Sequence, residues 1–222
     1  MTNLRSYGDP CGLARALDIV GERWSLLIVR ELLFGPKRFT DLRAGMPDAS
    51  PNVLAQRLRE LEGGGIIARR KLPPPAAAAV YELTERGRDL EPAVIALARW
   101  GSATPPLRGV ELSIDSLMLA LKTTFDPERA RGFRSRINVH FGSDRFRATI
   151  RNGRIDIARG EHDDPDARIE TTCSALRSVV FAGRKLPELR PGAIKIQGDE
   201  SAVRRFVQLF PLRNLRTQHH AG

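Results

Sequence analysis

Ser50-Pro51-Asn52-Val53-Leu54-Ala55-Gln56-Arg57-Leu58-Arg59-Glu60-Leu61 is the stretch that decides the fold of the first half of the chain. Ser50 suits the N-cap of a helix, and Pro51 suits its first position, where no backbone N–H is needed. At about 100° per residue, Leu54, Leu58 and Leu61 fall on one face. The stretch therefore predicts an amphipathic helix from residue 51 to about residue 62, which the Gly63-Gly64-Gly65 run ends.

The face of this helix opposite the leucines carries Asn52, Gln56 and Arg59. Asn and Gln side chains pair with adenine in the major groove, and Arg pairs with guanine. The free N–H groups at the N-terminus of the helix suit phosphate oxygens. Every amphipathic helix has a polar outer face, so this pattern favours DNA only together with its neighbours. Arg57 is expected on one flank of the apolar stripe, with Glu60 on the other, and is a further candidate for DNA contact.

The elements on either side of residues 51–62 complete the prediction of a winged helix-turn-helix. Two helices are expected between residues 12 and 34, and a short one follows from Arg38 to Met46. After the glycines the apolar period changes, which indicates strands at 66–72 and 80–84 around a stiff tip of Pro and Ala. A last helix is expected over 85–100, where Gly101 and then Pro105-Pro106 end it.

Charged and hydroxyl side chains near the helix are candidates for contact with DNA phosphates. The basic ones begin the preceding helix or lie along the hairpin. The alternative for the hairpin is a solvated strand edge, because charge there also blocks aggregation. Together with the helix residues, the candidates are Lys37, Arg38, Thr40, Ser50, Asn52, Gln56, Arg57, Arg59, Arg69 and Arg70.

Four segments of the first hundred residues resemble the HxlR family of bacterial transcriptional regulators: Cys11 to Leu32, Gly35 to Leu42, Ser50 to Leu61 and Tyr81 to Thr84. The resemblance covers about residues 5–101. It implies a homodimer that binds a palindromic operator in double-stranded DNA, as a repressor or an activator. It also implies that the outer helices, at about 12–20 and 85–100, form the dimer contact. The alternative is that the apolar side chains of 85–100 pack on their own domain.

Cys11 matches the N-terminal cysteine of that family, which in several members senses electrophiles or oxidants. With Asp9 as N-cap and Pro10 as the first helical residue, Cys11 is expected in the first helical turn. The helix dipole there favours a thiolate, whereas the neighbouring carboxylate opposes it. A free cysteine is more commonly a small buried apolar residue, so Cys11 is a candidate sensor with a structural alternative. Only Cys173 accompanies it, which excludes a disulfide framework and favours a reducing compartment.

The second half of the chain predicts a separate α+β domain. A helix is expected near residues 112–125, followed by strands of period two at 137–141, 146–150 and 155–157. Turns at 142–144 and at Asn152-Gly153 make these strands an antiparallel meander. A strand at 167–171, a helix at 174–182, a strand at 193–199 and a final helix at 200–210 follow. The prediction is a multi-domain α+β protein with a winged domain at 1–101, a linker at 102–108, a second domain at 109–213 and a tail at 214–222.

This second order of elements resembles the sterol-carrier-protein-like fold. The resemblance rests on Asn152-Gly153-Arg154-Ile155, on Pro165 to Thr171 and on Ile194 to Asp199 before the last helix. It implies an apolar ligand between sheet and helices, so the domain is expected to hold a small effector or to add a dimer surface. An ordinary core explains the same apolar residues equally well. Basic side chains suit an anionic effector or additional DNA backbone, with solvated surface as the alternative: Arg131, Arg134, Arg136, Arg145, Arg147, Arg151 and Arg154.

The net charge of the 222 residues is +10, which favours a polyanionic partner. Residues 1–100 carry 15 Lys and Arg against 12 Asp and Glu, so DNA binding by the first half must rest on where its charges lie. Hydrophobic residues make up 41% of the chain, as in an ordinary globular protein. Because no run of about 18 apolar residues and no apolar signal region is present, we expect a cytoplasmic protein with no membrane partner.

Motifs for catalysis, metals and cofactors are missing from the sequence. There is no phosphate-binding glycine loop, no nucleophile elbow and no Cys/His pair at metal-ligand spacing, and His140 and His162 are isolated. We therefore expect no catalytic residue, metal or cofactor. The remaining alternative is a carrier of small apolar molecules whose winged domain serves only protein–protein contact. Duplex binding that weakens with salt separates the two functions.

Overall fold

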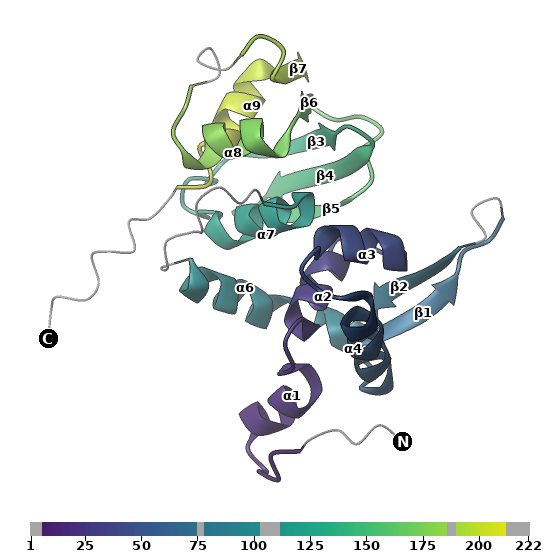
Figure 1. Ribbon diagram of the computed structural model, residues 1–222. Helices are drawn as coiled ribbons and strands as arrows, with labels where there is room; N and C mark the ends of the chain where they lie inside the picture. The colour runs from purple at the N-terminus through teal and green to yellow at the C-terminus, as the bar shows by residue number, and fades with distance from the viewer. Residues whose placement is uncertain (1–5, 75–77, 103–111, 186–189, 212–222) are drawn as a thin grey trace, which may run out of the picture. The chain divides into compact units, whose positions relative to one another are not determined.

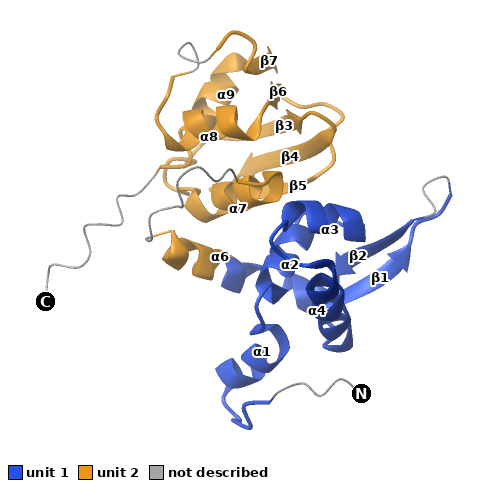
Figure 2. Cartoon of the chain, in the orientation of Figure 1, with its two compact units in different colours: residues 1–94 blue, residues 95–222 orange. Residues whose placement is uncertain are grey.

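Residues 6–74, 78–102, 112–185 and 190–211 are described by the computed structural model, and they form the helices and strands of Figure 1. The chain divides into two units, residues 1–94 and 95–222 (Figure 2). Three expected features lie at least partly outside the described residues: the hairpin tip at 75–77, most of the linker at 103–108 and the tail at 214–222.

Four helices form the first part of unit 1: α1 (Gly12–Val20), α2 (Ser25–Leu32), α3 (Phe39–Gly45) and α4 (Pro51–Gly63). Their positions confirm the helices predicted from the apolar spacing. Leu54, Leu58 and Leu61 of α4 are at most 2% exposed. Burial of each leucine contributes about 1.5–3 kcal/mol, so this face fixes the orientation of α4.

A two-stranded hairpin follows α4, as the change of period predicts. Strands β1 (Ile67–Lys71) and β2 (Ala79–Leu83) pair antiparallel, with Ile67 opposite Leu83. Lys37 adds a bridge to this hairpin, because its backbone N–H and C=O both bond to Tyr81. The segment between α2 and α3 is therefore hydrogen-bonded to the hairpin, which completes a winged helix-turn-helix.

The prediction of a single helix over residues 85–100 is wrong. The structure has a short helix α5 (Glu85–Arg88) and a separate helix α6 (Glu91–Gly101). Pro92 explains the break, because a proline inside a helix lacks the N–H for the carbonyl four residues earlier and its ring clashes with that carbonyl, here that of Arg88. In α5, Gly87 lies against the hairpin so closely that an added Cβ would be 2.1 Å from the Ile66 carbonyl oxygen.

Unit 2 contains a five-stranded sheet with helices, and every strand and helix predicted for it is present. The helices are α7 (Ile114–Thr124), α8 (Cys173–Phe181) and α9 (Glu200–Val207). The strands are β3 (Ser135–Phe141), β4 (Asp144–Arg151), β5 (Arg154–Arg159), β6 (Ala167–Thr171) and β7 (Ile194–Gly198), in the order β5-β4-β3-β6-β7. α9 ends three residues before the predicted position.

The sheet is not antiparallel throughout, which corrects the prediction. Strands β3, β4 and β5 form the expected meander, but β6 pairs parallel to β3. After β5 the chain crosses from one end of the sheet to the other through residues 160–166, which we call the strap, before β6 begins. This return makes β6 run in the direction of β3, and sequence periodicity carries no information about it.

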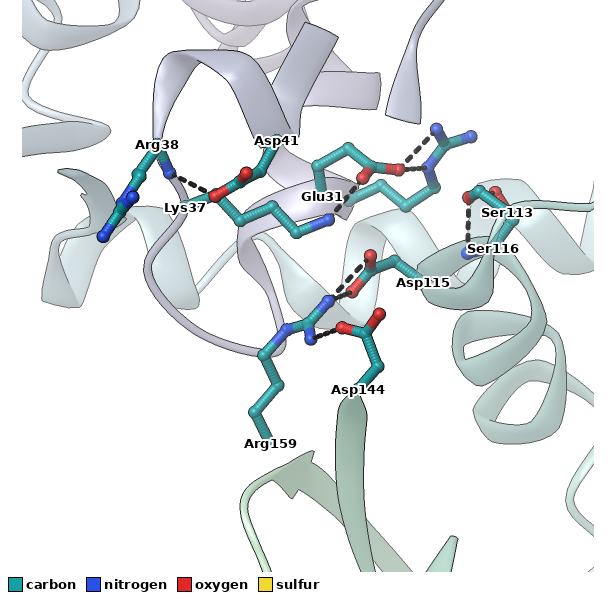
Figure 3. Close-up of polar contacts among 10 residues, drawn as sticks. Glu31, Lys37, Arg38, Asp41, Ser113, Asp115, Ser116, Asp144 and Arg159 are labelled. Atoms are coloured by element: carbon teal, nitrogen blue, oxygen red, sulfur yellow. Dashed lines mark hydrogen bonds and ion pairs between the residues drawn. The ribbon is translucent and has the colours of Figure 1, made fainter. Parts of the chain in front are cut away.

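Arg159 joins α7 to the sheet. Its guanidinium lies 2.9 Å from Asp115 in the first turn of α7 and also pairs with Asp144 at the start of β4 (Figure 3). It also lies 4.7 Å from the centre of the Phe146 ring. Asp115 is buried, so its charge is stabilised by this pair.

Candidate nucleic-acid interface

Helix α4 presents the residues that the sequence selects for base contact. Ser50 caps the helix, since its Oγ accepts the N–H of Val53 at 3.3 Å. Asn52, Gln56 and Arg59 are all exposed on the side away from the buried leucines. The Gln56 amide donates to Glu60 at 2.9 Å, an exposed hydrogen bond that can exchange for one to a base. The outer face of α4 is thus free along its length.

Arg57 is not on that free surface, which corrects its place among the DNA candidates. Its side chain is 15% exposed and pairs with Glu22 at 3.0 Å and with Glu60. Arg57 and Glu60 lie three residues apart and share one flank of the helix, so their expected placement on opposite flanks was wrong. Arg57 therefore attaches α4 to the segment between α1 and α2.

Lys37 is also removed from the phosphate candidates. Its side chain is 8% exposed, and its Nζ lies 2.6 Å from Glu31 Oε2 (Figure 3). Glu31 is fully buried and accepts a second charged hydrogen bond from Arg30 at 2.8 Å. Sequence reasoning missed this carboxylate, although Glu31 falls within the apolar periodicity of its helix, which was the available signal. The buried pair joins α2 to the segment that bridges the hairpin.

Arg38 and Thr40 remain exposed at the start of α3. The backbone N–H of Arg38 donates to Asp41 Oδ2 at 3.0 Å (Figure 3), which caps the helix. Among the residues that the structure describes, the Arg38 guanidinium forms no ion pair. This side chain is available to an anion.

The two hairpin arginines differ. Arg70 forms a two-pronged pair with Glu82 on the facing strand, both distances being 3.0 Å. The hydrogen bond from Arg70 lowers the pKa of Glu82, and the same bond raises the pKa of Arg70. Arg69 is exposed and has no ion-pair partner in the described part of the chain. Of these two arginines, Arg69 can bind a phosphate directly, whereas Arg70 must first break its ion pair with Glu82.

Cys11 lies two positions earlier relative to the helix than expected. It is the N-cap of α1, which begins at Gly12, and Asp9 instead accepts the Cys11 N–H at 2.8 Å. The thiol is exposed, and the backbone N–H groups of Leu13 and then Ala14 lower its pKa. The helix N-terminus therefore favours the thiolate, as expected, although the residue is not inside the first turn.

Large apolar side chains are exposed on helices α1 and α6. Leu13 and Leu17 on α1 are 68% and 37% exposed. Leu97 and Trp100 on α6 are 51% and 77% exposed. Within the described residues both groups remain exposed to solvent.

Clefts with mixed polar and apolar linings occur in the described part of unit 2. One of about 460 Å³ includes Arg134 and Arg205 near the start of α9. Another of about 380 Å³ includes His140, Arg145 and Lys195. Within the described ranges no group of three or more metal-ligating side chains occurs. Helices in those ranges are also too short or too polar to cross a bilayer.

Two different protein families match the N-terminal and C-terminal parts of the chain. Residues 109–214 match the family described as alkyl sulfatase C-terminal, so the sterol-carrier resemblance of unit 2 stays a prediction. Residues 19–107 match the family described as HxlR-like helix-turn-helix.

Relatives of the N-terminal part have the same description. The HTH-type transcriptional regulator sll1512 of Synechocystis is 38% identical over 95 residues, which cover 43% of this chain and 70% of that protein. YvaP of Bacillus subtilis, another HTH-type transcriptional regulator, is 38% identical over 88 residues, covering 40% and 82%. The solved redox regulator HypR in its oxidized form is 33% identical and covers 44% of this chain and 100% of its own, with a TM-score of 0.41. The chain thus belongs to the HxlR-like helix-turn-helix family, whose members compared here are HTH-type transcriptional regulators.

Proposed function

We propose that this chain is a homodimeric transcriptional regulator that reads a palindromic operator in double-stranded DNA with α4. The observation that carries the proposal is the exposed row of Asn52, Gln56 and Arg59 on a helix whose other face is fully buried. Asn52 and Gln56 suit adenine, and Arg59 suits guanine. Each good two-pronged base contact discriminates by about 1–3 kcal/mol.

Some of the remaining candidates suit direct contact with DNA phosphates, and the others stabilise the elements that present these contacts. Arg38, Thr40 and Arg69 are exposed and suit phosphate oxygens, as do the free N–H groups at the start of α4. Lys37, Arg57 and Arg70 have acidic partners inside the unit and act by holding α2, α4 and the hairpin in place. Ser50 acts as the helix cap.

Dimerisation is proposed to use the exposed apolar side chains of α1 and α6. Large apolar groups that stay in solvent commonly mark an interface, and Trp is enriched among residues that dominate binding energy. Leu13 and Leu17 on α1, and Leu97 and Trp100 on α6, fit this role. Two copies are needed if one operator presents two half-sites.

Cys11 is proposed as a thiol sensor of this regulator. An exposed thiol with a lowered pKa reacts faster with electrophiles and oxidants because the thiolate is the nucleophile. Because Cys11 is the N-cap of α1, modification of its thiol would alter a helix of the proposed dimer contact.

Unit 2 is proposed to bind an effector in a sterol-carrier-like fold. The order of its strands and helices supports the fold. Its clefts are lined by both basic and acidic side chains, such as Arg205 with Asp199 and Lys195 with Glu170, so the proposal leaves open a small apolar or an anionic effector.

The test is binding to the DNA upstream of the protein's own gene, with random duplex as competitor, across a salt series and with and without reductant. We expect binding that resists the competitor and that loses this preference when Asn52, Gln56 and Arg59 are changed to Ala. A variant with Arg177→Ala, an exposed residue of α8 in unit 2, is the control. Binding no tighter than that of random duplex under every condition would refute the proposal.

A further inference from the structure

The strand pairing of unit 2 places six arginines on one face of the sheet. Directly paired residues point to the same side, and the pairs here include Arg136 with Thr149, His140 with Arg145, and Arg151 with Arg154. The opposite side holds the buried apolar core, such as Ile137, Phe146 and Ile169. The arginines of the polar face are Arg136, Arg145, Arg147, Arg151, Arg154 and Arg168.

The strap neutralises one half of this polar face. Glu161 lies 2.8 Å from His140, 3.6 Å from Arg168 and 3.9 Å from Arg145. Asp164 lies 3.0 Å from Arg136. The strap also covers Asn138, which is fully buried and exchanges two hydrogen bonds with the backbone of His162. The half formed by β3 and β6 therefore already has an anionic cover.

Three arginines of β4 and β5 have no acidic partner from the strap, although the strap also reaches β4, where Glu161 lies 3.9 Å from Arg145 and His162 hydrogen-bonds to Thr149. Arg147, Arg151 and Arg154 are exposed, and none forms an ion pair with any residue in the ranges that the structure describes. Arg151 and Arg154 are directly opposite each other across a two-residue turn. Like charges in that position destabilise a strand pair, so the stability of the fold does not account for them. We call these three residues the arginine face.

We propose that the arginine face binds the phosphate backbone of duplex DNA, without sequence preference and in addition to α4. Guanidinium groups match phosphate oxygens with two parallel hydrogen bonds. Arg147 and Arg151 on β4 are separated by about 13 Å at about 3.3 Å per residue. Over that length a duplex carries about 8 phosphate charges.

The chemistry of the face favours duplex DNA over a single strand. Single-stranded nucleic acid is bound by aromatic side chains that stack on the bases. Of the residues on the described polar face of the sheet, none is Phe, Tyr or Trp. The proposal rests on the function proposed above, because it takes DNA as the partner of the chain.

The first experiment uses the full chain and a fluorescent random-sequence duplex of about 30 base pairs in a salt series. The variant Arg147→Gln, Arg151→Gln, Arg154→Gln is compared with Arg131→Gln, Arg177→Gln, Arg204→Gln, which removes the same charge from exposed positions elsewhere in unit 2. Each lost phosphate contact lowers the salt slope by about 0.9. We expect the slope to fall by about 2.7, so that affinity between 50 and 200 mM salt changes about 40-fold less than for the wild type.

Further arms separate this inference from the proposed function. A single Arg147→Gln variant, with the smallest risk to folding, is expected to lower the slope by about 0.9. Asp164→Asn, which frees Arg136, is expected to tighten binding. Variants of α4 are expected to lose sequence preference while the effect of the arginine face on the slope persists.

Three results would overturn the inference. Equal salt slopes for the triple variant and its control would refute DNA binding by the arginine face, but would not contradict base recognition by α4. Absence of duplex binding by the wild-type chain would remove both proposals. Loss of binding to phosphatidylserine vesicles with an unchanged DNA slope would assign the face to membranes instead.

Discussion

Lys37→Met is expected to destabilise unit 1 strongly, although Lys37 begins the segment that the sequence assigns to phosphate contact. The side chain of Lys37 is 8% exposed, and its partner Glu31 is fully buried. Removing one member of a buried ion pair costs about 3–5 kcal/mol, because the other charge stays buried without it. Arg30 still donates to Glu31 Oε1, so we expect the lower end, about 3 kcal/mol. For a unit of this size the melting temperature falls by about 12–24 °C.

Thermal unfolding of the full chain measures this loss, with Arg38→Met as the matched control. Arg38 is an exposed neighbour with the same charge, and its substitution is expected to change stability by less than about 0.5 kcal/mol. The double variant Glu31→Gln, Lys37→Met is expected to recover part of the loss, because no carboxylate then stays buried without Lys37, although Arg30 loses its ion pair with Glu31. Equal melting temperatures for the two single variants, with a DNA salt slope lowered by about 0.9 only for Lys37→Met, would refute the buried-pair reasoning.

Gln56→Ala is expected to relax base preference, whereas Arg69→Ala weakens binding to all duplexes about equally and lowers the salt slope by about 0.9. Competition with random duplex measures both, and the reverse pattern would mean that α4 presents a different face. In a Cys173→Ser background, alkylation of Cys11 in the folded chain is expected to rise at a lower pH than in the urea-unfolded chain, because two backbone N–H groups lower the pKa of its thiol; equal midpoints contradict the thiolate argument. Burial, and then the charge of Arg145, lower the pKa of His140 despite the nearby Glu161, so the folded state favours the neutral ring. Unit 2 is therefore expected to lose stability as the pH falls below about 6.5, the unfolded pKa of His, until the folded pKa is passed. Denaturant titrations between pH 5 and 7.5 detect this, and His140→Gln should remove it; an unchanged dependence in that variant assigns it elsewhere.

Much of the fold follows from local sequence patterns. Ser50 and Pro51 start α4, and the leucine spacing orients it, because both depend on residues within one helix. The strands of unit 2 follow from period two, and Asn152-Gly153 marks the turn between β4 and β5. Features whose cause lies within about ten residues were therefore predicted.

The features that were wrong depend on residues distant in sequence or on a competing local rule. Arg57, expected on the opposite flank of α4 from Glu60, pairs with Glu60 and also with Glu22 on another segment. A list of basic residues treats paired and free guanidinium groups alike, so it overestimates the surface that is left for DNA. The parallel pairing of β6 with β3 depends on the strap, which has no periodic signal.

The positions of the unpaired basic side chains suggest different roles for the two units in DNA binding. Lys37, Arg57 and Arg70 have acidic partners within unit 1, so we expect them to contribute less to its phosphate contacts. Arg38 and Arg69 remain, which gives two phosphate contacts and a salt slope of about 1.8 for each protomer on the duplex. Adding the three residues of the arginine face raises this to five contacts and a slope of about 4.5 per protomer. A wild-type slope near the lower value would mean that unit 1 binds DNA alone, whereas one near the higher value requires unit 2 to contact the backbone while α4 reads the bases.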